Sequence, residues 1–385
     1  MDPMFDSFLD DSHRMFRESC EAFVASEVRP QVEQWEEAES FPVELYRKAG
    51  EAGLLGVNLP EAYGGGGGDL FHLIMMIEAF LPCGSTGVLA GLGSHAIALP
   101  PILELGTEDQ KQRWIPPVLR GETVAALAIT EPDAGSDVAA ITTRARRDGD
   151  DYVLDGRKLY ITSGARAGLV TVLARTGEAG HGGLTFFVVE SDRPGYGVSR
   201  ALRKTGWRAS DTVELVFEDC RVPAENVMRG EGEGVKILMS GLDYERTVLS
   251  GGPVGIMQAC IDEVLPYLHT REQFGQPIGT FQLMQGKLAD MYADLNACRA
   301  YLYAVAAACD RGEETRQDCA AVILYTAEKA TQLALEAIQA LGGFGYTNES
   351  NAGRLLRDAK LYEIGAGTSE IRRMLIGREL FNASA

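Results

Sequence analysis

Apolar residues recur at helical spacing through the first third of the chain. The stretches 14–28, 71–80 and 95–105 carry apolar side chains three and four positions apart, which predicts helices. Thr107, with a glutamine three residues further on, has the form of a capping box and predicts the start of another helix. These patterns together predict a helical N-terminal domain over residues 1–122.

The pattern changes to alternation in the middle of the chain. The stretch 141–146 alternates, and the stretches 184–190 and 212–218 are rich in β-forming residues. The Asp-Gly pairs at 148–149 and 155–156 predict tight turns between strands. We therefore predict an antiparallel β domain over residues 123–235.

Helical periodicity returns in the last part of the chain, residues 236–385. Four long runs there have the length and spacing of bundle helices: 254–269, 281–311, 315–341 and 368–381. The expected fold class is α+β, with a helical domain, a β domain and a C-terminal four-helix bundle in that order.

Two glycine-rich stretches predict loops. Five consecutive glycines occupy positions 64–68, which no helix or strand tolerates. Gly230, Gly232 and Gly234 have the spacing of a dinucleotide loop, but the two glutamates between them would repel a pyrophosphate. No strand, glycine loop and helix open the chain, so the pattern excludes a Rossmann domain.

Composition and charge narrow the possible partners. The 385 residues include 36 basic and 55 acidic side chains, a net charge of −19, which argues against binding to nucleic acids or anionic membranes. Seven scattered cysteines without a C-x-x-C pair indicate reduced thiols, and the five histidines show no metal-ligand spacing, so we expect no metal. The acidic N-terminus has no targeting pattern, and a cytoplasmic protein is the expectation.

Four segments carry side chains suited to a flavin nucleotide. Small and hydroxyl residues at 127–137 suit close approach of a flat polar ligand, although a polar turn would look the same. Tyr160 could pack against a flavin and Thr162 could donate to it, or both could belong to an ordinary edge strand. The cation, aromatic and amides of 271–282 suit a pyrophosphate and an adenine, whereas the paired glycines of 339–343 suit either close backbone approach or a helix stop.

In this order the four segments resemble the acyl-CoA dehydrogenase family, over nearly the whole chain. The resemblance implies a central β-barrel, bound FAD held partly by a neighbouring subunit, a homotetramer, and electron transfer to electron-transferring flavoprotein. It carries FAD contacts over to Leu127, Ile129, Thr130, Gly135, Ser136, Tyr160, Ile161, Thr162, Arg271, Phe274, Gln282, Gln339, Gly342, Gly343, Thr368 and Glu370.

The resemblance also locates the catalytic base. The reaction removes a weakly acidic α-proton from a thioester, which needs a desolvated carboxylate and hydrogen bonds to the thioester oxygen. Many family members have a Glu at the position of Ala366, which keeps only its backbone amide for that oxygen. A minority have the base on a bundle helix, and there the sequence offers Glu245. Glu363, three residues from Ala366, is a nearby alternative that the family alignment points elsewhere, and Asp243, two residues from Glu245, faces the other side of a helix.

Within the family the stretches 241–252, 278–292 and 360–373 are most similar to the isovaleryl-CoA dehydrogenases, which implies a short branched acyl-CoA substrate. Gly365 stands where many straight-chain enzymes have Tyr and would leave room for a branch. The same resemblance assigns substrate contacts to Ser136, Asp243, Arg246, Gly365, Ala366 and Gly367. Gly91 and Leu92 are smaller than their isovaleryl counterparts and could deepen the pocket for a longer or terpenoid, citronellyl-like chain.

Three rival functions remain open at this point. A flavin oxidase would share the first half-reaction and then use oxygen. A non-catalytic acyl-CoA-binding flavoprotein would keep the cofactor without turnover, and a plain helical interaction module would bind no cofactor. Oxygen consumption, turnover and the colour of the purified protein distinguish them.

Overall fold

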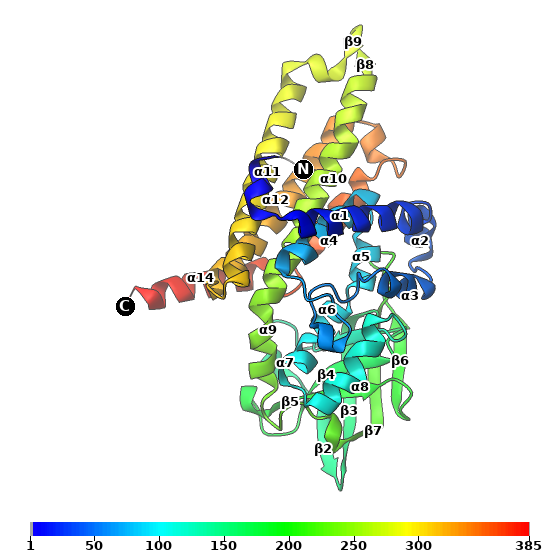
Figure 1. Ribbon diagram of the computed structural model, residues 1–385, viewed down its shortest axis with the longest axis vertical. Helices are drawn as coiled ribbons and strands as arrows, with labels where there is room; N and C mark the ends of the chain where they lie inside the picture. Colours follow the sequence, from blue (N-terminus) through cyan, green and yellow to red (C-terminus); the bar gives the residue numbers. More distant parts are fainter. Residues whose placement is uncertain (1–2, 385) are drawn as a thin grey trace.

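The computed structural model describes residues 3–384, apart from the side chain of Ser240. Long helices form one end of the molecule and the β domain the other, with the N-terminal helices packed across the region between them (Figure 1). One large core joins the N-terminal helices to the C-terminal helices, and two smaller cores lie in and beside the β domain.

The N-terminal part is helical, as predicted. Its helices are α1 (Asp11–Phe23), α2 (Val32–Ala38), α3 (Glu44–Glu51), α4 (Leu70–Phe80), α5 (Thr86–Leu92), α6 (His95–Ala98), α7 (Pro100–Leu105) and α8 (Glu108–Leu119), with a π-helical turn at Val24–Val28. The predicted capping box at Thr107 is confirmed, with Gln110 as its partner. Two further capping boxes start α1 and α4, where Asp10 pairs with His13 and Asp69 with His72.

The middle part is a single seven-stranded sheet. Its strands are β1 (Ala125–Ala128), β2 (Arg144–Asp148), β3 (Asp151–Thr162), β4 (Leu169–Arg175), β5 (Leu184–Glu190), β6 (Tyr196–Ala201) and β7 (Thr212–Pro223). The order is β1-β4-β2-β3-β7-β6, with β5 pairing β4. Most pairs are antiparallel, as predicted, but β1 and β2 both pair parallel with β4, which was not predicted.

The two predicted turns had different outcomes. The Asp-Gly pair at 148–149 lies in the tight connection from β2 to β3, as predicted. The pair at 155–156 lies inside β3, where the register shifts between Leu154 and Gly156. Gly156 has φ of +152°, a conformation that side chains disfavour, so here the glycine makes a bulge and not a turn.

The C-terminal part contains α9 (Gly234–Leu249), α10 (Gly251–Thr270), α11 (Gln282–Asp310), α12 (Arg316–Leu341), α13 (Ala352–Leu361) and α14 (Ser369–Ala383), with a short hairpin of β8 (Glu272–Gln273) and β9 (Gln276–Pro277). α10, α11 and α12 run side by side, and the end of α14 projects away from the body (Figure 1). Within residues 3–384 no single helix is long and apolar enough to cross a bilayer; only α5 together with α6–α7, bent by 44°, has the required length and composition.

Candidate active site

The ends of β1 and β3 are fixed to each other by a buried network. The backbone N–H of Leu159 donates to Thr130 O at 2.8 Å, and Lys158 Nζ donates to Ile129 O at 2.8 Å. Lys158 Nζ also lies 2.9 Å from Glu131 Oε1, and the Lys158 side chain has no exposed surface. The two segments assigned to the flavin, around 127–130 and 160–162, therefore form one rigid wall.

Electrostatics explain why both charges of this network persist in the interior. Burial would raise the pKa of Glu131, but the charge of Lys158 and four hydrogen bonds lower it to about 2. Burial lowers the pKa of Lys158 to about 8, against the opposing charge of Glu131. A buried pair of this kind is retained only where each charge has its partner and its remaining hydrogen bonds.

The side chains along this wall point in different directions. Tyr160 has φ of +64° and is 65% exposed, so its ring stands out from the sheet. Ile161 is buried in the core of the β domain and can offer a ligand only its backbone. Thr162 is half-buried, while Gly135 and Ser136 lie exposed on the following loop. An exposed aromatic ring beside backbone polar groups is a surface suited to a flat ring system.

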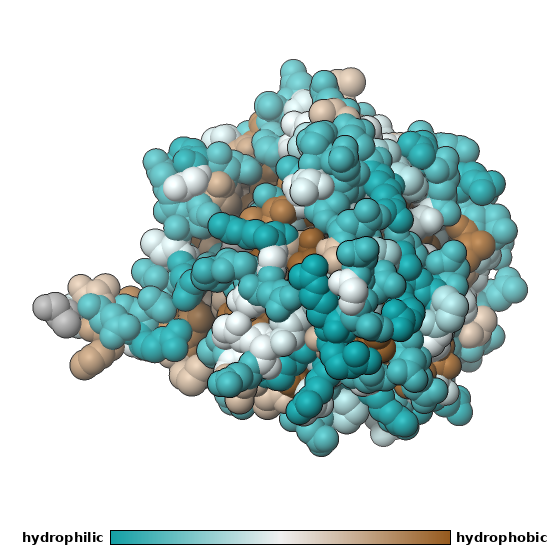
Figure 2. Space-filling model, turned by 90° about the horizontal axis from the view of Figure 1, so that it is seen from below, coloured by the Kyte–Doolittle hydropathy of each residue, from teal (hydrophilic) through white to brown (hydrophobic). Residues whose placement is uncertain are grey.

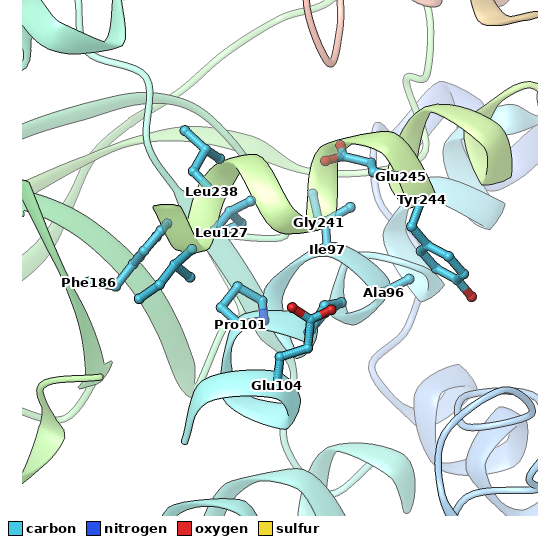
Figure 3. A pocket seen from close by; sticks show the side chains of 12 residues that line it. Ala96, Ile97, Pro101, Glu104, Leu127, Phe186, Leu238, Gly241, Tyr244 and Glu245 are labelled. Atoms are coloured by element: carbon cyan, nitrogen blue, oxygen red, sulfur yellow. The ribbon is translucent and has the colours of Figure 1, made fainter. Parts of the chain in front are cut away.

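A small cavity separates α9 from α6 and α7. Figure 3 shows Leu238, Gly241 and Tyr244 of α9 on one side of it. Its lining is mostly apolar and comprises Ala96, Ile97, Pro100, Pro101, Glu104, Leu127, Phe186, Ile237, Leu238, Gly241, Tyr244 and Glu245. The free volume is about 30 Å³, room for at least one water-sized group. This space suits the tip of a hydrocarbon chain.

Glu245 lies on α9 at this cavity, half-buried, and on the side of the helix away from Glu104 (Figure 3). Burial raises the pKa of Glu245 to about 7, opposed by the positive charges of Arg246 and Arg372. Among the described residues, none donates a hydrogen bond to its carboxylate. A carboxylate with a pKa near neutrality and no donor holding its oxygens is a competent proton acceptor at neutral pH.

The loop between α13 and α14 faces α9. Arg372, fully buried, donates to Tyr362 O at 2.7 Å and to Gly365 O at 2.6 Å and so holds this loop. Ala366 and Gly367 follow with φ of +53° and +94°. Within residues 3–384 their backbone N–H groups have no acceptor. A methyl group placed on Gly367 would lie 3.9 Å from Arg246 Nη2, so the loop and the base-bearing helix are neighbours.

Several buried polar atoms around this junction are without protein partners. They include Arg246 Nε, Ser369 Oγ and Arg372 Nε, and no described residue bonds to them. Buried polar atoms are ordinarily satisfied, so a group of unsatisfied ones next to free backbone amides marks a place for a polar ligand. Thr368, predicted to contact FAD, caps the N-terminus of α14 in the same place, and Glu370 is exposed in the first turn of that helix.

Two other carboxylates and one serine were also candidates for the site. Asp243 forms a 3.0 Å ion pair with Arg246 and a 3.7 Å ion pair with Arg316, so it orients arginines and is not itself a free base. Glu363 accepts from Thr331 Oγ1 at 2.5 Å and from Lys360 at 2.7 Å, which removes the alternative base that the sequence left open. Ser136 lies in the β-domain loop, and no recorded contact joins it to the α9 group.

The other predicted FAD residues lie at the far end of the bundle. Arg271, Phe274 and Gln282 surround the β8–β9 hairpin, which Figure 1 shows at the opposite end from the β domain. The short 3₁₀ helix η9 (Phe344–Tyr346) reaches the same end, because the ring of Phe344 stacks on that of Tyr267 in α10, with the ring centroids 5.5 Å apart. All six residues of this group are exposed: Arg271, Phe274, Gln282, Gln339, Gly342 and Gly343. This group therefore lies at the opposite end of the molecule from the β domain that carries Tyr160 (Figure 1).

The expectation that Gly91 and Leu92 deepen the pocket was wrong. A methyl group on Gly91 would lie 2.4 Å from the ring of Phe41, so the glycine makes room for Phe41 and not for a ligand. Leu92 is buried in the main core. Neither residue lines the cavity beside α9.

Three family models, all of acyl-CoA dehydrogenase, match the chain. The N-terminal domain matches residues 10–122, the middle domain 126–220 and the C-terminal domain 232–381. The chain therefore belongs to the acyl-CoA dehydrogenase family, and it is an FAD-dependent oxidoreductase that dehydrogenates acyl-CoA. The exposed ring of Tyr160 and the unsatisfied polar atoms at the start of α14 fit such a cofactor.

Individual relatives cover almost the full length. The chain is 50% identical to the mitochondrial isovaleryl-CoA dehydrogenase of Solanum tuberosum, over 98% of this chain and 94% of the relative. It is 51% identical to the mitochondrial 2-methylacyl-CoA dehydrogenase of the same plant, over 97% and 91%. A crystal structure of a probable acyl-CoA dehydrogenase from Mycobacterium abscessus has a TM-score of 0.95 at 37% identity, covering 97% of this chain and 100% of that one.

Proposed function

We propose that the protein converts a short branched acyl-CoA, such as isovaleryl-CoA, to its 2-enoyl-CoA, with Glu245 as the base. The observation that carries this proposal is the position of Glu245. It is a carboxylate with a pKa near 7 on the helix that lines an apolar cavity, opposite free backbone amides. Identity near 50% to isovaleryl-CoA and 2-methylacyl-CoA dehydrogenases supports a branched substrate and leaves the position of the branch to experiment.

Each group has one task in the proposed mechanism. Glu245 takes the α-proton onto a carboxylate oxygen. The N–H of Ala366 donates to the thioester oxygen and stabilises the negative charge that develops there. Bound FAD supplies the hydride acceptor for the β-carbon. Arg246, held by Asp243, keeps positive charge beside the base.

The space near the base supports a short branched chain over a long one. A side chain at Gly365 would meet only Leu361 O, at 3.6 Å, so this position leaves open space beside the loop. The Gly91 position, which suggested a deeper pocket for a longer chain, is filled by Phe41.

A homotetramer that completes the FAD site belongs to the same proposal. Six predicted FAD contacts lie exposed at the end of the bundle far from Tyr160, where a second copy of the chain could bring them to its neighbour's flavin. Large apolar side chains are exposed on the same part of the molecule, with Phe274 94% and Leu283 86% exposed. The projecting end of α14 carries Leu380 and Phe381, and apolar surface is visible there in Figure 2.

The electron acceptor proposed is electron-transferring flavoprotein. Support for it comes from membership of the family alone. A flavin oxidase remains the rival. Oxygen uptake during turnover at a rate matching product formation would favour the oxidase.

The test is anaerobic reduction of the bound flavin by defined substrates. We expect isovaleryl-CoA to bleach the visible flavin absorbance of the purified protein fast, and octanoyl-CoA at least tenfold more slowly. Faster bleaching by 2-methylbutanoyl-CoA would mean that the preferred substrate carries its branch on the α-carbon, with the same mechanism. Faster bleaching by octanoyl-CoA would contradict a short branched substrate, and a colourless protein that FAD does not restore would contradict the function as a whole.

A further inference from the structure

Two histidines that are distant in sequence converge on one aspartate in the N-terminal domain. His13 Nε2 lies 2.9 Å and 3.0 Å from the two carboxylate oxygens of Asp69, and 56 residues separate them along the chain. His72 Nδ1 lies 2.8 Å from Asp69 Oδ1. The centroids of the two imidazole rings are 4.4 Å apart. The cluster lies where the starts of α1 and α4 meet, and neither the base nor the flavin wall uses it.

The backbone around this cluster is shaped to hold it. The glycine run 64–68 leads directly into Asp69, and a methyl group on Gly68 would lie 3.0 Å from His72 Cγ and Nδ1. Only glycine at that position lets the imidazole lie against the chain. His13 is 5% exposed, whereas the Asp69 side chain is 41% exposed. The cluster is therefore anchored on one side and open to solvent on the other.

The distances have the size that metal coordination requires. In a six-coordinate site with bonds of about 2.1 Å, neighbouring ligand atoms stand about 3.0 Å apart, against about 3.4 Å in a tetrahedral site. The separations of 2.8–3.0 Å match neighbouring positions of the six-coordinate geometry. Two imidazoles and one carboxylate with open positions are a ligand set that Ni²⁺, Co²⁺, Fe²⁺ and Zn²⁺ accept.

Two further carboxylates, those of Asp10 and Asp310, lie near the two imidazoles. His13 Nδ1 accepts from the backbone N–H of Asp10 at 3.0 Å and lies 3.1 Å from Asp10 Oδ1, so metal binding through Nε2 requires the tautomer in which Nδ1–H donates to that carboxylate instead. Asp310, whose Oδ1 accepts from the backbone N–H of Leu70, interacts electrostatically with both imidazoles. The carboxylates of Asp10, Asp69 and Asp310 near the two imidazoles would offset a divalent charge. The backbone N–H of Asp69, at 3.3 Å from His72 Nδ1, is a longer contact that a metal on that nitrogen would replace.

We propose that His13 Nε2, an Asp69 carboxylate oxygen and His72 Nδ1 bind one divalent transition-metal ion in an open, six-coordinate site, with water in the remaining positions. The site is separate from the proposed dehydrogenase chemistry, and its ion would join the start of α1 to the start of α4.

The test uses the FAD-loaded protein, treated with a chelator and dialysed, and titrated with Ni²⁺ in a calorimeter. We expect one saturable Ni²⁺ per chain, with affinity falling in the order Ni²⁺, Co²⁺, Mn²⁺. His72→Gln should weaken binding by about a hundredfold because it removes a ligand, and Asp10→Asn by about tenfold because it loosens His13. His181→Gln, on a distant exposed loop, is the matched control and should bind as the unaltered protein does.

Two results would overturn the proposal. One is the absence of saturable Ni²⁺ binding, which would leave the cluster as a hydrogen-bonded link between two helix starts. The other is unchanged affinity in His72→Gln. Should that variant fail to fold, acylation of histidines by diethyl pyrocarbonate decides the matter in the unaltered protein: Ni²⁺ should protect His72 and not His181, and equal modification of His72 with and without Ni²⁺ would contradict the site.

Discussion

The strand-end wall and helix α9 each remove a glutamate from water, with opposite results. The Glu131 carboxylate accepts four hydrogen bonds, one of them from the buried Lys158, and its pKa is about 2. Glu245 receives none from a described residue and faces only nearby arginine charge, and its pKa is about 7. Burial is common to both sites. The donors around the carboxylate decide whether it serves as a fixed structural anion or as a base.

The largest expected effect comes from removing the base. Glu245→Gln keeps the size of the side chain and loses the proton acceptor, so turnover of isovaleryl-CoA should fall by about 10²–10⁴-fold. FAD content and near-UV circular dichroism should stay unchanged. Glu363→Gln is the matched control, since that carboxylate is already bound by Lys360 and Thr331, and its turnover should remain within about threefold. A comparable loss of turnover in both variants would contradict the assignment of Glu245 as the base.

The next effect tests the strand-end wall. Lys158→Met leaves the Glu131 carboxylate buried without its cation, which should lower the free energy of unfolding by about 3–5 kcal/mol. Chemical denaturation with fluorescence detection measures this. Adding Glu131→Gln to the variant should recover part of the loss, because no unpaired charge remains. An unchanged unfolding midpoint in Lys158→Met would show that the pair does not fix the wall.

The pH dependence of the reaction sharpens the comparison. Below pH 7 a growing fraction of Glu245 is protonated and cannot accept a proton, so kcat/KM should fall by about tenfold per pH unit on the acidic side. Glu131 is ionised throughout this range and should contribute no acidic limb. Measurement of kcat/KM between pH 5 and 9 checks both statements. An acidic limb near the ordinary glutamate value would mean that Glu245 is not desolvated in the working enzyme.

The smallest effect concerns stability. Because the pKa of Glu245 rises from 4.5 to about 7 on folding, the folded state binds more protons than the unfolded chain between these values. Its stability therefore falls as pH rises through that window. Glu245→Gln escapes this loss and should be more stable than the unaltered protein at pH 8 by at most about 3 kcal/mol, reduced by partial exposure, and equal to it at pH 4.5. Thermal unfolding at the two pH values measures the difference, and an equal difference at both would contradict it.

Much of the fold was predictable because local patterns decide it. Helical spacing predicted the long N-terminal and C-terminal helices. Alternation and β-rich runs predicted three of the seven strands of the large sheet. The parallel pairing of β1 and β2 with β4 was missed because pairing depends on contacts between segments far apart in the sequence. The bulge at Gly156 was missed because an Asp-Gly pair can form either a turn or a bulge, and the pairing of β3 with its neighbour decides between them.

In the candidate site, too, some residues could be predicted from the sequence and others could not. Glu245 could be predicted as the base because the carboxylate missing at Ala366 has a counterpart at position 245, which is visible in the sequence. The roles of Lys158 and Arg372 were missed, because a lysine in a strand and an arginine in a helix are ordinarily surface residues. Their function depends on burial and on which carbonyls they reach, and only the folded chain shows this. Gly91 misled for the same reason, since its neighbour Phe41 lies 50 positions earlier in the sequence.

The most direct test of the central claim separates proton removal from hydride transfer. Isovaleryl-CoA would be incubated anaerobically with the protein in D₂O, and deuterium entering the α-carbon of recovered substrate measured by mass spectrometry. The unaltered protein should catalyse the exchange, with a rate that rises through pH 7, and Glu245→Gln should not exceed the rate without protein. Exchange by Glu245→Gln at the unaltered rate would contradict Glu245 as the base.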